Sequence, residues 1–142
     1  MTTAKDMNAT IHNEYAAVAQ ALDTYYDGLY RGDTSALGEV FHPDARYVTA
    51  SDGKVLQLDM KSYLPKVAAR QSPESLGEPY GYTLESIEFA GSTAASVRMR
   101  SSMLGKHFID FLSLIHVDGK WRIISKVFDF QEQDPPSSTG GK

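Results

Sequence analysis

The stretch YYDGLYRGD at Tyr25–Asp33, followed by FHPDARYV at Phe41–Val48, decides the fold of this chain. The residues around it repeat at steps of three and four, which is the period of a helix with one buried face. That face consists of Tyr15, Val18, Leu22, Tyr25 and Leu29, and Ala19, Tyr26 and Tyr30 flank it. The pattern predicts a long amphipathic helix that carries several tyrosines into the interior.

The sequence also predicts where this helix ends. Gly32 suits a helix C-terminus, and Asp33 or Thr34 can cap a second, short helix over Ser35–Val40. Pro43 stops the short helix, so the chain should turn there and continue as a strand.

Further along, turn residues separate alternating apolar segments. Ser51-Asp52-Gly53 predicts a hairpin turn, Asp59 caps a third helix, and residues 71–81 form a Pro- and Gly-rich loop that could act as a lid. The predicted strands and third helix are Arg46–Ala50, Lys54–Leu58, Met60–Arg70 (the helix), Tyr82–Ala90, Ala94–Met103, Lys106–Val117 and Lys120–Phe130. Strands joined by tight turns form an antiparallel meander, and the helices must cover one of its faces.

These elements predict an α+β fold, in which a curved antiparallel sheet of about six strands wraps around the long N-terminal helix. The molecule should be cone-shaped, with an internal cavity at its open end. At 142 residues the chain suits a single domain over residues 11–130. A flexible N-terminus over residues 1–10 and a disordered tail over residues 131–142 are expected to flank it, since both are poor in apolar groups.

Composition restricts the function. The net charge of −4 and the lack of a basic cluster argue against nucleic-acid and membrane partners. The chain has no cysteine, no His-x-His or HExxH motif and no phosphate-binding loop, so we expect no metal site and no cofactor. It has no signal peptide and no apolar run of the roughly 20 residues that span a membrane, so we expect a cytoplasmic protein.

The chain resembles the nuclear transport factor 2-like superfamily, which includes ketosteroid isomerases, scytalone dehydratase and polyketide cyclase (SnoaL-like) proteins. The resemblance spans roughly residues 12–130, and its motifs are Tyr25–Asp33, Leu37–Phe41, Pro43–Ala45 and Val117–Ile123. DFLSL at Asp110–Leu114 and GKWRIISKVF at Gly119–Phe128 are most similar to the branch labelled "putative lumazine-binding". That label implies no particular ligand, and the fold carries many unrelated activities.

The resemblance implies roles for single positions. Tyr25 stands where ketosteroid isomerases place the tyrosine that donates to the substrate oxyanion. Thr49 stands where they place the aspartate base, and a threonine cannot act as that base, which argues against ketosteroid isomerisation. Their third group, a carboxylic acid, would fall at Ser113 or Leu114, with Asp110 close by.

Asp110 is the most unusual residue, because the segment Ile109–Ile115 is otherwise apolar on both faces. A carboxylate there must be paired, hydrogen-bonded or protonated. Lys126 is its natural partner, provided that one extra bulge residue in the Val117–Lys120 turn puts both on one face. The pair would then be either structural, at the pocket floor or a dimer seam, or part of a catalytic or binding site.

Other polar candidates have competing interpretations. His107 would lie on the opposite face from Asp110 in a regular strand, so it would act only with a group from another strand. Tyr26 and Tyr30 would either contact a ligand or pack at the core rim. The remaining candidates for the pocket are Thr49, Tyr63, Ser113, Lys126 and Phe128, and the residues expected in core and cavity walls include Met99, Met103, Phe108, Phe111 and Phe130.

We therefore expect the chain to bind a small apolar or aromatic metabolite in the cavity. Cofactor-free lyase, isomerase or hydratase chemistry would follow if Tyr25 or Tyr26 donates to a ligand oxygen and Asp110, with or without His107, moves a proton. The alternative is a non-catalytic binding module or a dimeric interaction module. A homodimer is expected in either case, because the apolar residues on both faces of Lys106–Val117 need cover.

Overall fold

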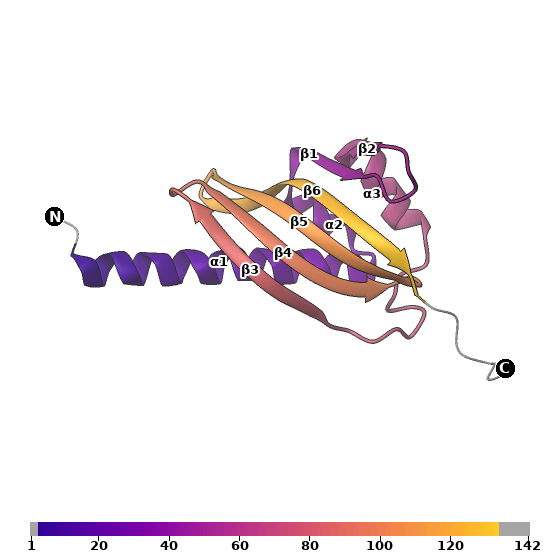
Figure 1. Ribbon diagram of the computed structural model, residues 1–142, viewed down its shortest axis with the longest axis horizontal. Helices are drawn as coiled ribbons and strands as arrows, with labels where there is room; N and C mark the ends of the chain where they lie inside the picture. The colour runs from indigo at the N-terminus through magenta and orange to yellow at the C-terminus, as the bar shows by residue number, and fades with distance from the viewer. Residues whose placement is uncertain (1–2, 134–142) are drawn as a thin grey trace.

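The computed structural model describes residues 3–133, and within them the chain forms three helices and one sheet (Figure 1). The helices are α1 (Ala4–Arg31), α2 (Thr34–Val40) and α3 (Met60–Ala69). The strands are β1 (Phe41–Thr49), β2 (Leu56–Asp59), β3 (Tyr82–Ala90), β4 (Ala94–Met103), β5 (Lys106–Val117) and β6 (Lys120–Glu132). Parts of the expected N-terminus (1–10) and tail (131–142) fall outside the described residues, while α1 begins as early as Ala4 and β6 continues to Glu132.

The helix ends follow the predicted capping residues. Gly32 has φ +69°, a left-handed conformation that glycine adopts without strain, and it ends α1. The Asp33 carboxylate accepts a hydrogen bond from the Ala36 N–H at 3.0 Å and caps α2. Asp59 caps α3 in the same way, through the Ser62 N–H at 2.8 Å. These short-range signals set where each helix begins and hence where β1 starts.

The six strands form one sheet in the order β2-β1-β6-β5-β4-β3. The α+β prediction is confirmed: a curved, unclosed sheet lies along α1, with α2 and α3 near β1 and β2 (Figure 1). The predicted meander of β3 to β6 is antiparallel throughout. The expectation of a wholly antiparallel sheet needs one correction, because β1 pairs with β6 in parallel. These two strands are far apart in sequence, so no tight turn dictates their relative direction.

A bulge in β6 decides which residues share a face. Ser113 pairs with Ser125 but Leu114 pairs with Ile123, so β6 has one extra residue at this point. Asp110 and Lys126 therefore point to the same concave face, as the sequence required for their pairing. The extra residue was expected in the turn after Val117, but Val117 pairs directly with Lys120 and the bulge lies within the strand.

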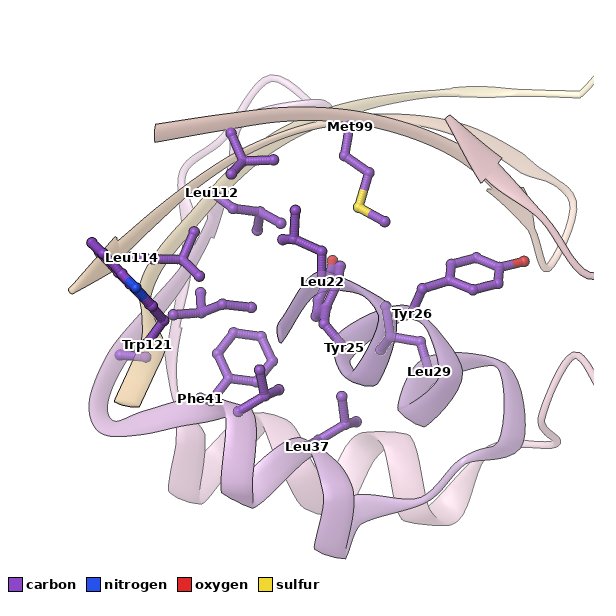
Figure 2. Close-up of a cluster of buried hydrophobic side chains, with 14 of the residues drawn as sticks. Leu22, Tyr25, Tyr26, Leu29, Leu37, Phe41, Met99, Leu112, Leu114 and Trp121 are labelled. Atoms are coloured by element: carbon purple, nitrogen blue, oxygen red, sulfur yellow. The ribbon is translucent and has the colours of Figure 1, made fainter. Parts of the chain in front are cut away.

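The core fills the space between α1, α2 and the concave face of the sheet (Figure 2). Val18, Leu22, Tyr25 and Leu29 are buried as predicted. Two other residues were placed wrongly by the sequence pattern. Tyr15, on the N-terminal part of α1, is 48% exposed, and Phe111 lies on the convex face of the sheet and is 52% exposed. Phe111 alternates with Asp110 and Leu112, which face the core.

Candidate functional site

A narrow cavity of about 30 Å³ lies between α1, α3 and the concave face of the sheet. By volume it holds one or two water molecules, and its walls combine aromatic rings with a few polar groups. The residues that line it are Tyr25, Leu29, Tyr47, Tyr63, Arg70, Ser101, Met103, Leu104, Phe108, Asp110 and Lys126. Arg70, just after α3, is exposed, which places it at the solvent side of this cavity.

Tyr25 and Asp110 form a buried hydrogen bond at the cavity wall. The Tyr25 hydroxyl donates to Oδ2 of Asp110 at 2.8 Å, and Asp110 is only 2% exposed. Its second oxygen, Oδ1, is buried without a hydrogen-bond partner among the described residues. Burial, and next the charge of Asp110, raise the pKa of Tyr25 well above its usual value, so the phenol remains a donor. The unpartnered oxygen is a ready acceptor for a ligand proton.

Lys126 brings an amine to the same cavity. Its Nζ lies 5.3 Å from the ring centroid of Tyr25 and 5.3 Å from that of Tyr47. The rings of Phe128 and Phe108 lie 4.7 and 5.9 Å from it. We call these four rings the aromatic cage. Lys126 is 4% exposed, and the ion pairs of the described residues do not join it to Asp110 within 4.0 Å. Lys126 is therefore held mainly by ring faces.

Tyr63 and Tyr47 form the wall of the cavity on the side of α3 and β1. Their rings stack at 4.3 Å between centroids, with 25° between planes. Burial raises the pKa of Tyr63 to about 12, although the nearby positive charge of Arg70 lowers it in part. Burial also raises the pKa of Tyr47, and the positive charge of Lys126 opposes that rise. Both phenols thus stay protonated near neutral pH.

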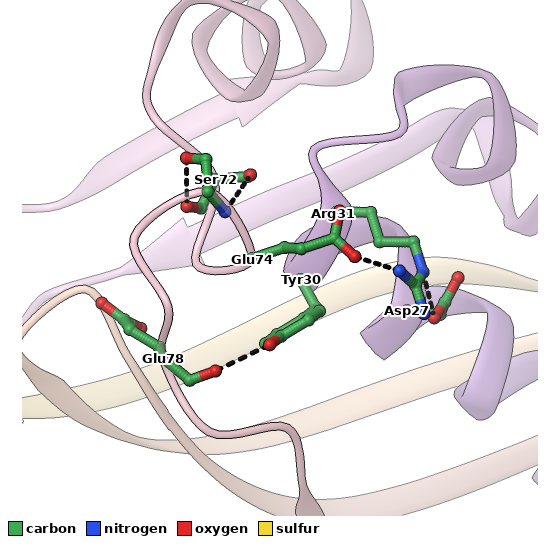
Figure 3. A network of polar contacts seen from close by, with 7 residues as sticks. Asp27, Tyr30, Arg31, Ser72, Glu74 and Glu78 are labelled. Carbon is green, nitrogen blue, oxygen red and sulfur yellow. Dashed lines mark hydrogen bonds and ion pairs between the residues drawn. The ribbon is translucent and has the colours of Figure 1, made fainter.

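Tyr26 and Tyr30 hold the loop 71–81 against α1 rather than facing this cavity. The Tyr30 hydroxyl donates to the carbonyl of Glu78 at 2.7 Å, and the Gly81 N–H donates to the Tyr26 hydroxyl at 3.0 Å (Figure 3 shows the first). Arg31 adds ion pairs to Asp27 and Glu74. The loop is therefore a latched segment at one end of the sheet, in keeping with the predicted position of a lid.

The other predicted site residues are dispersed. His107 is exposed on the convex face, where its Nδ1 lies 2.6 Å from the Ser102 hydroxyl, so the structure does not bring it to Asp110. Ser113 is likewise exposed on that face. Thr49 is buried but donates to the carbonyl of Phe128 at 2.8 Å, which joins β1 to β6. Phe128 reaches the site as part of the aromatic cage.

A larger hollow of about 740 Å³ lies at the end of the sheet that holds His107. Most of its lining residues are exposed, including Arg100, Asp129 and Gln131, and it contains no buried polar atom that lacks a partner. The cavity around Asp110 is smaller, but a buried carboxylate, phenol and amine converge there. Convergent, desolvated titratable groups are the better mark of a functional site, so we place the candidate site at the small cavity.

The sequence missed Tyr47, Arg70 and Leu104 as site residues. Alternation along β1 could have found Tyr47, because it shares a face with Thr49, which was expected in the pocket. No local signal marks Arg70 or Leu104, which come from the end of α3 and the turn after β4.

Over residues 3–133 no cluster of His, Asp or Glu side chains could hold a metal ion, and no helix has the length and apolarity to cross a membrane.

Comparison with known proteins identifies the family of this chain and finds solved structures with the same fold. Residues 13–129 match the family described as "Putative lumazine-binding". An aldolase named FrzH, from Cladobotryum sp, is 28% identical over 117 residues, which cover 82% of this chain and 90% of the relative.

Two solved structures of NTF2-like proteins of unknown function are each 25% identical to this chain. The one from Shewanella baltica OS155 has a TM-score of 0.75 and covers 85% of this chain and 96% of its own. The one from Silicibacter pomeroyi DSS-3 has a TM-score of 0.73 and covers 85% and 98%. Fold and family together support ligand binding. The chain belongs to the "Putative lumazine-binding" family of the nuclear transport factor 2-like superfamily.

Proposed function

We propose that this protein binds a small aromatic or apolar carbonyl compound in the Asp110 cavity and catalyses a cofactor-independent lyase reaction on it. The observation that carries the proposal is the unpartnered Oδ1 of Asp110, which is buried at the cavity wall while Tyr25 holds the other oxygen. A carboxylate fixed in this way can take a proton from the carbon next to a carbonyl group. The name of the relative FrzH, an aldolase, supports chemistry of this class.

Each group has a defined task in this reaction. Oδ1 of Asp110 accepts the proton, and the Tyr25 hydroxyl stabilises the carboxylate by its hydrogen bond to Oδ2. The positive charge at Lys126 borders the same cavity, where it can stabilise the negative charge that develops on the ligand. The rings of Tyr47, Tyr63 and Phe108 contact the apolar part of the ligand. Since the cavity is only about 30 Å³, binding requires its walls, including Leu104, to move outward.

The proposal is tested by measuring how fast the protein exchanges the protons on the carbon next to a carbonyl group for deuterium. Phenylacetone is incubated with the protein in deuterated buffer, and the loss of its methylene protons is followed by NMR. The wild type should exchange them faster than buffer alone, and Asp110→Asn should lower the enzymatic rate by about 100-fold or more. Asp52→Asn, in the exposed turn after β1, is the matched control. Exchange at the wild-type rate in Asp110→Asn would show that Asp110 is not the base.

A non-catalytic binding module is the second candidate, and the narrow cavity and latched loop favour it. Thermal stabilisation by phenylacetone in the absence of any exchange above the buffer rate would identify this alternative. No stabilisation and no exchange would refute ligand binding of the proposed class.

We also propose that the protein works as a homodimer that packs through the convex face of the sheet. Phe111 and Val127 pair with each other across β5 and β6 at the middle of this face and are 52% and 47% exposed. A second copy of this face would cover the two exposed apolar side chains together.

A further inference from the structure

The surroundings of Lys126 are unusual for a buried lysine. Buried ammonium groups are normally paired with a carboxylate or hydrogen-bonded, because desolvation of an unpaired charge is costly. Here Asp110 is engaged by Tyr25, and Lys126 makes no ion pair within 4.0 Å among the described residues. Its Nζ instead points among the four rings of the aromatic cage and lines the cavity. Among the described residues the amine therefore borders the cavity without a carboxylate partner.

We propose that Lys126 is a nucleophile that forms a covalent iminium (Schiff base) with the carbonyl carbon of the ligand. The inference rests on the proposed function only for the class of ligand, an aldehyde or ketone. Lysine amines form iminium intermediates of this kind with carbonyl substrates.

The step balances without any further reactant. The ammonium of Lys126 gives one proton to the carbonyl oxygen, and the lone pair of Nζ then forms a C–N bond with the carbonyl carbon, which leaves a hydroxyl on that carbon. A second proton from nitrogen converts the hydroxyl to water, which leaves as nitrogen forms the C=N bond of the iminium cation. Oδ1 of Asp110 can then take a proton from the neighbouring carbon to give an enamine, and addition of water to the iminium reverses the attachment.

The aromatic cage suits both states of the lysine. A protonated lysine and an iminium carry the same single positive charge, so the attraction of the ring faces persists when one replaces the other. Tyr25 links the two functional groups, because its ring lies 5.3 Å from Nζ and its hydroxyl bonds Asp110 at 2.8 Å. The nucleophile and the proton acceptor thus both lie next to Tyr25 and line the same cavity.

Reductive trapping tests the inference on the full chain. Acetaldehyde, a carbonyl compound small enough for a narrow cavity, is added with cyanoborohydride, which reduces an iminium to a stable ethylamine. Peptide mapping then gives the rate at each lysine. Lys126 should be ethylated at least tenfold faster than the exposed Lys61 and Lys66, equivalent to about 1.4 kcal/mol in barrier. A merely structural buried lysine should react more slowly than both, and that result would overturn the inference.

A variant supplies a second readout. Lys126→Arg keeps a cation in the cage but cannot form an iminium, and Lys66→Arg, on the exposed side of α3, is the matched control. If exchange of phenylacetone proceeds in a folded Lys126→Arg protein at the wild-type rate, the nucleophile is refuted while the proposed function stands. If Lys126 is trapped selectively but the wild type exchanges nothing, the nucleophile stands and the proposed function fails.

Discussion

Tyr25 supplies the only hydrogen bond to the Asp110 carboxylate that the described residues provide. Tyr25→Phe removes this donor and leaves both carboxylate oxygens buried without a partner. We expect a loss of about 2 kcal/mol in the free energy of unfolding, because an unsatisfied buried acceptor bears its full desolvation penalty. Urea unfolding at neutral pH measures this directly.

Tyr15→Phe is the matched control for that substitution. Tyr15 lies on the same helix but is 48% exposed, so removal of its hydroxyl should change stability by less than about 0.5 kcal/mol. Equal effects of the two substitutions would mean that the Tyr25–Asp110 hydrogen bond contributes nothing specific to stability.

Because of Tyr63, the free energy of unfolding should decrease at alkaline pH. Its pKa of about 12 in the folded protein lies above the usual value of 10.0, so the folded state holds the phenolic proton more tightly than the unfolded state. Its contribution is therefore fully present below pH 10 and is lost as pH rises toward 12, by up to ~3 kcal/mol. Unfolding by urea at about pH 9 and about pH 11.5 should show the loss.

Tyr63→Phe retains the ring that stacks on Tyr47 but has no proton to lose. The variant should lose less stability than the wild type over the same pH interval. Tyr25 continues to titrate in it, since burial also raises the pKa of that phenol, so part of the alkaline loss remains. An identical loss in both proteins would show that the pKa of Tyr63 is not raised.

Single residues of the site were predictable where they interrupt a clear sequence pattern, as Asp110 does, or continue one, as Tyr25 does. Asp110 interrupts an apolar run, and Tyr25 lies on the buried stripe of a helix, so both were found and do meet. The proximity of Lys126 to the site depended on a bulge within β6, which no local sequence signal locates. His107 lies on the convex face, opposite Asp110, as strand alternation predicts, and Ser113, which was named from the position of the third ketosteroid isomerase group, is exposed on the same face.

At the scale of elements, the close approach of α1 and α2 depends on one glycine. A Cβ added at Gly28 would lie 2.8 Å from Cδ2 and 2.9 Å from Cγ of Leu37, which is fully buried. Gly28→Ala should therefore destabilise the protein by about 1–3 kcal/mol through overpacking, despite the higher helix propensity of alanine. Thermal or urea unfolding would measure the change.

Substitution of Gly38 should change stability in the opposite direction. It lies within α2, is exposed, and a Cβ there would meet nothing within 4 Å. Gly38→Ala should stabilise the protein by about 0.5–1 kcal/mol through helix propensity alone. If both substitutions stabilise, α1 and α2 can separate at little cost and Gly28 does not set their distance.

Most elements were predictable from the sequence, but their arrangement was less so. Turn residues and caps act over a few positions, so the three helices and the β3–β6 meander were correctly anticipated. The parallel pairing of β1 with β6 joins segments almost 80 residues apart, and nothing in either strand alone fixes their direction. The latch between Tyr30 and Glu78 is likewise a contact between distant segments.

The whole molecule leaves one face of its sheet uncovered, because the helices occupy only the concave side (Figure 1). On the convex side, exposed Phe111 lies beside Val127, and Arg98 lies over the Phe111 ring at 5.6 Å.

In a dimer built on this face, Phe111→Lys would bury a charge against its own copy. Sedimentation should therefore give a dimer for the wild type at micromolar concentration and a monomer for Phe111→Lys. Val55→Lys, at a 75% exposed apolar residue outside the strands, should leave the dimer intact. A monomeric wild type would refute the interface, whereas a dimeric Phe111→Lys would place it on another surface.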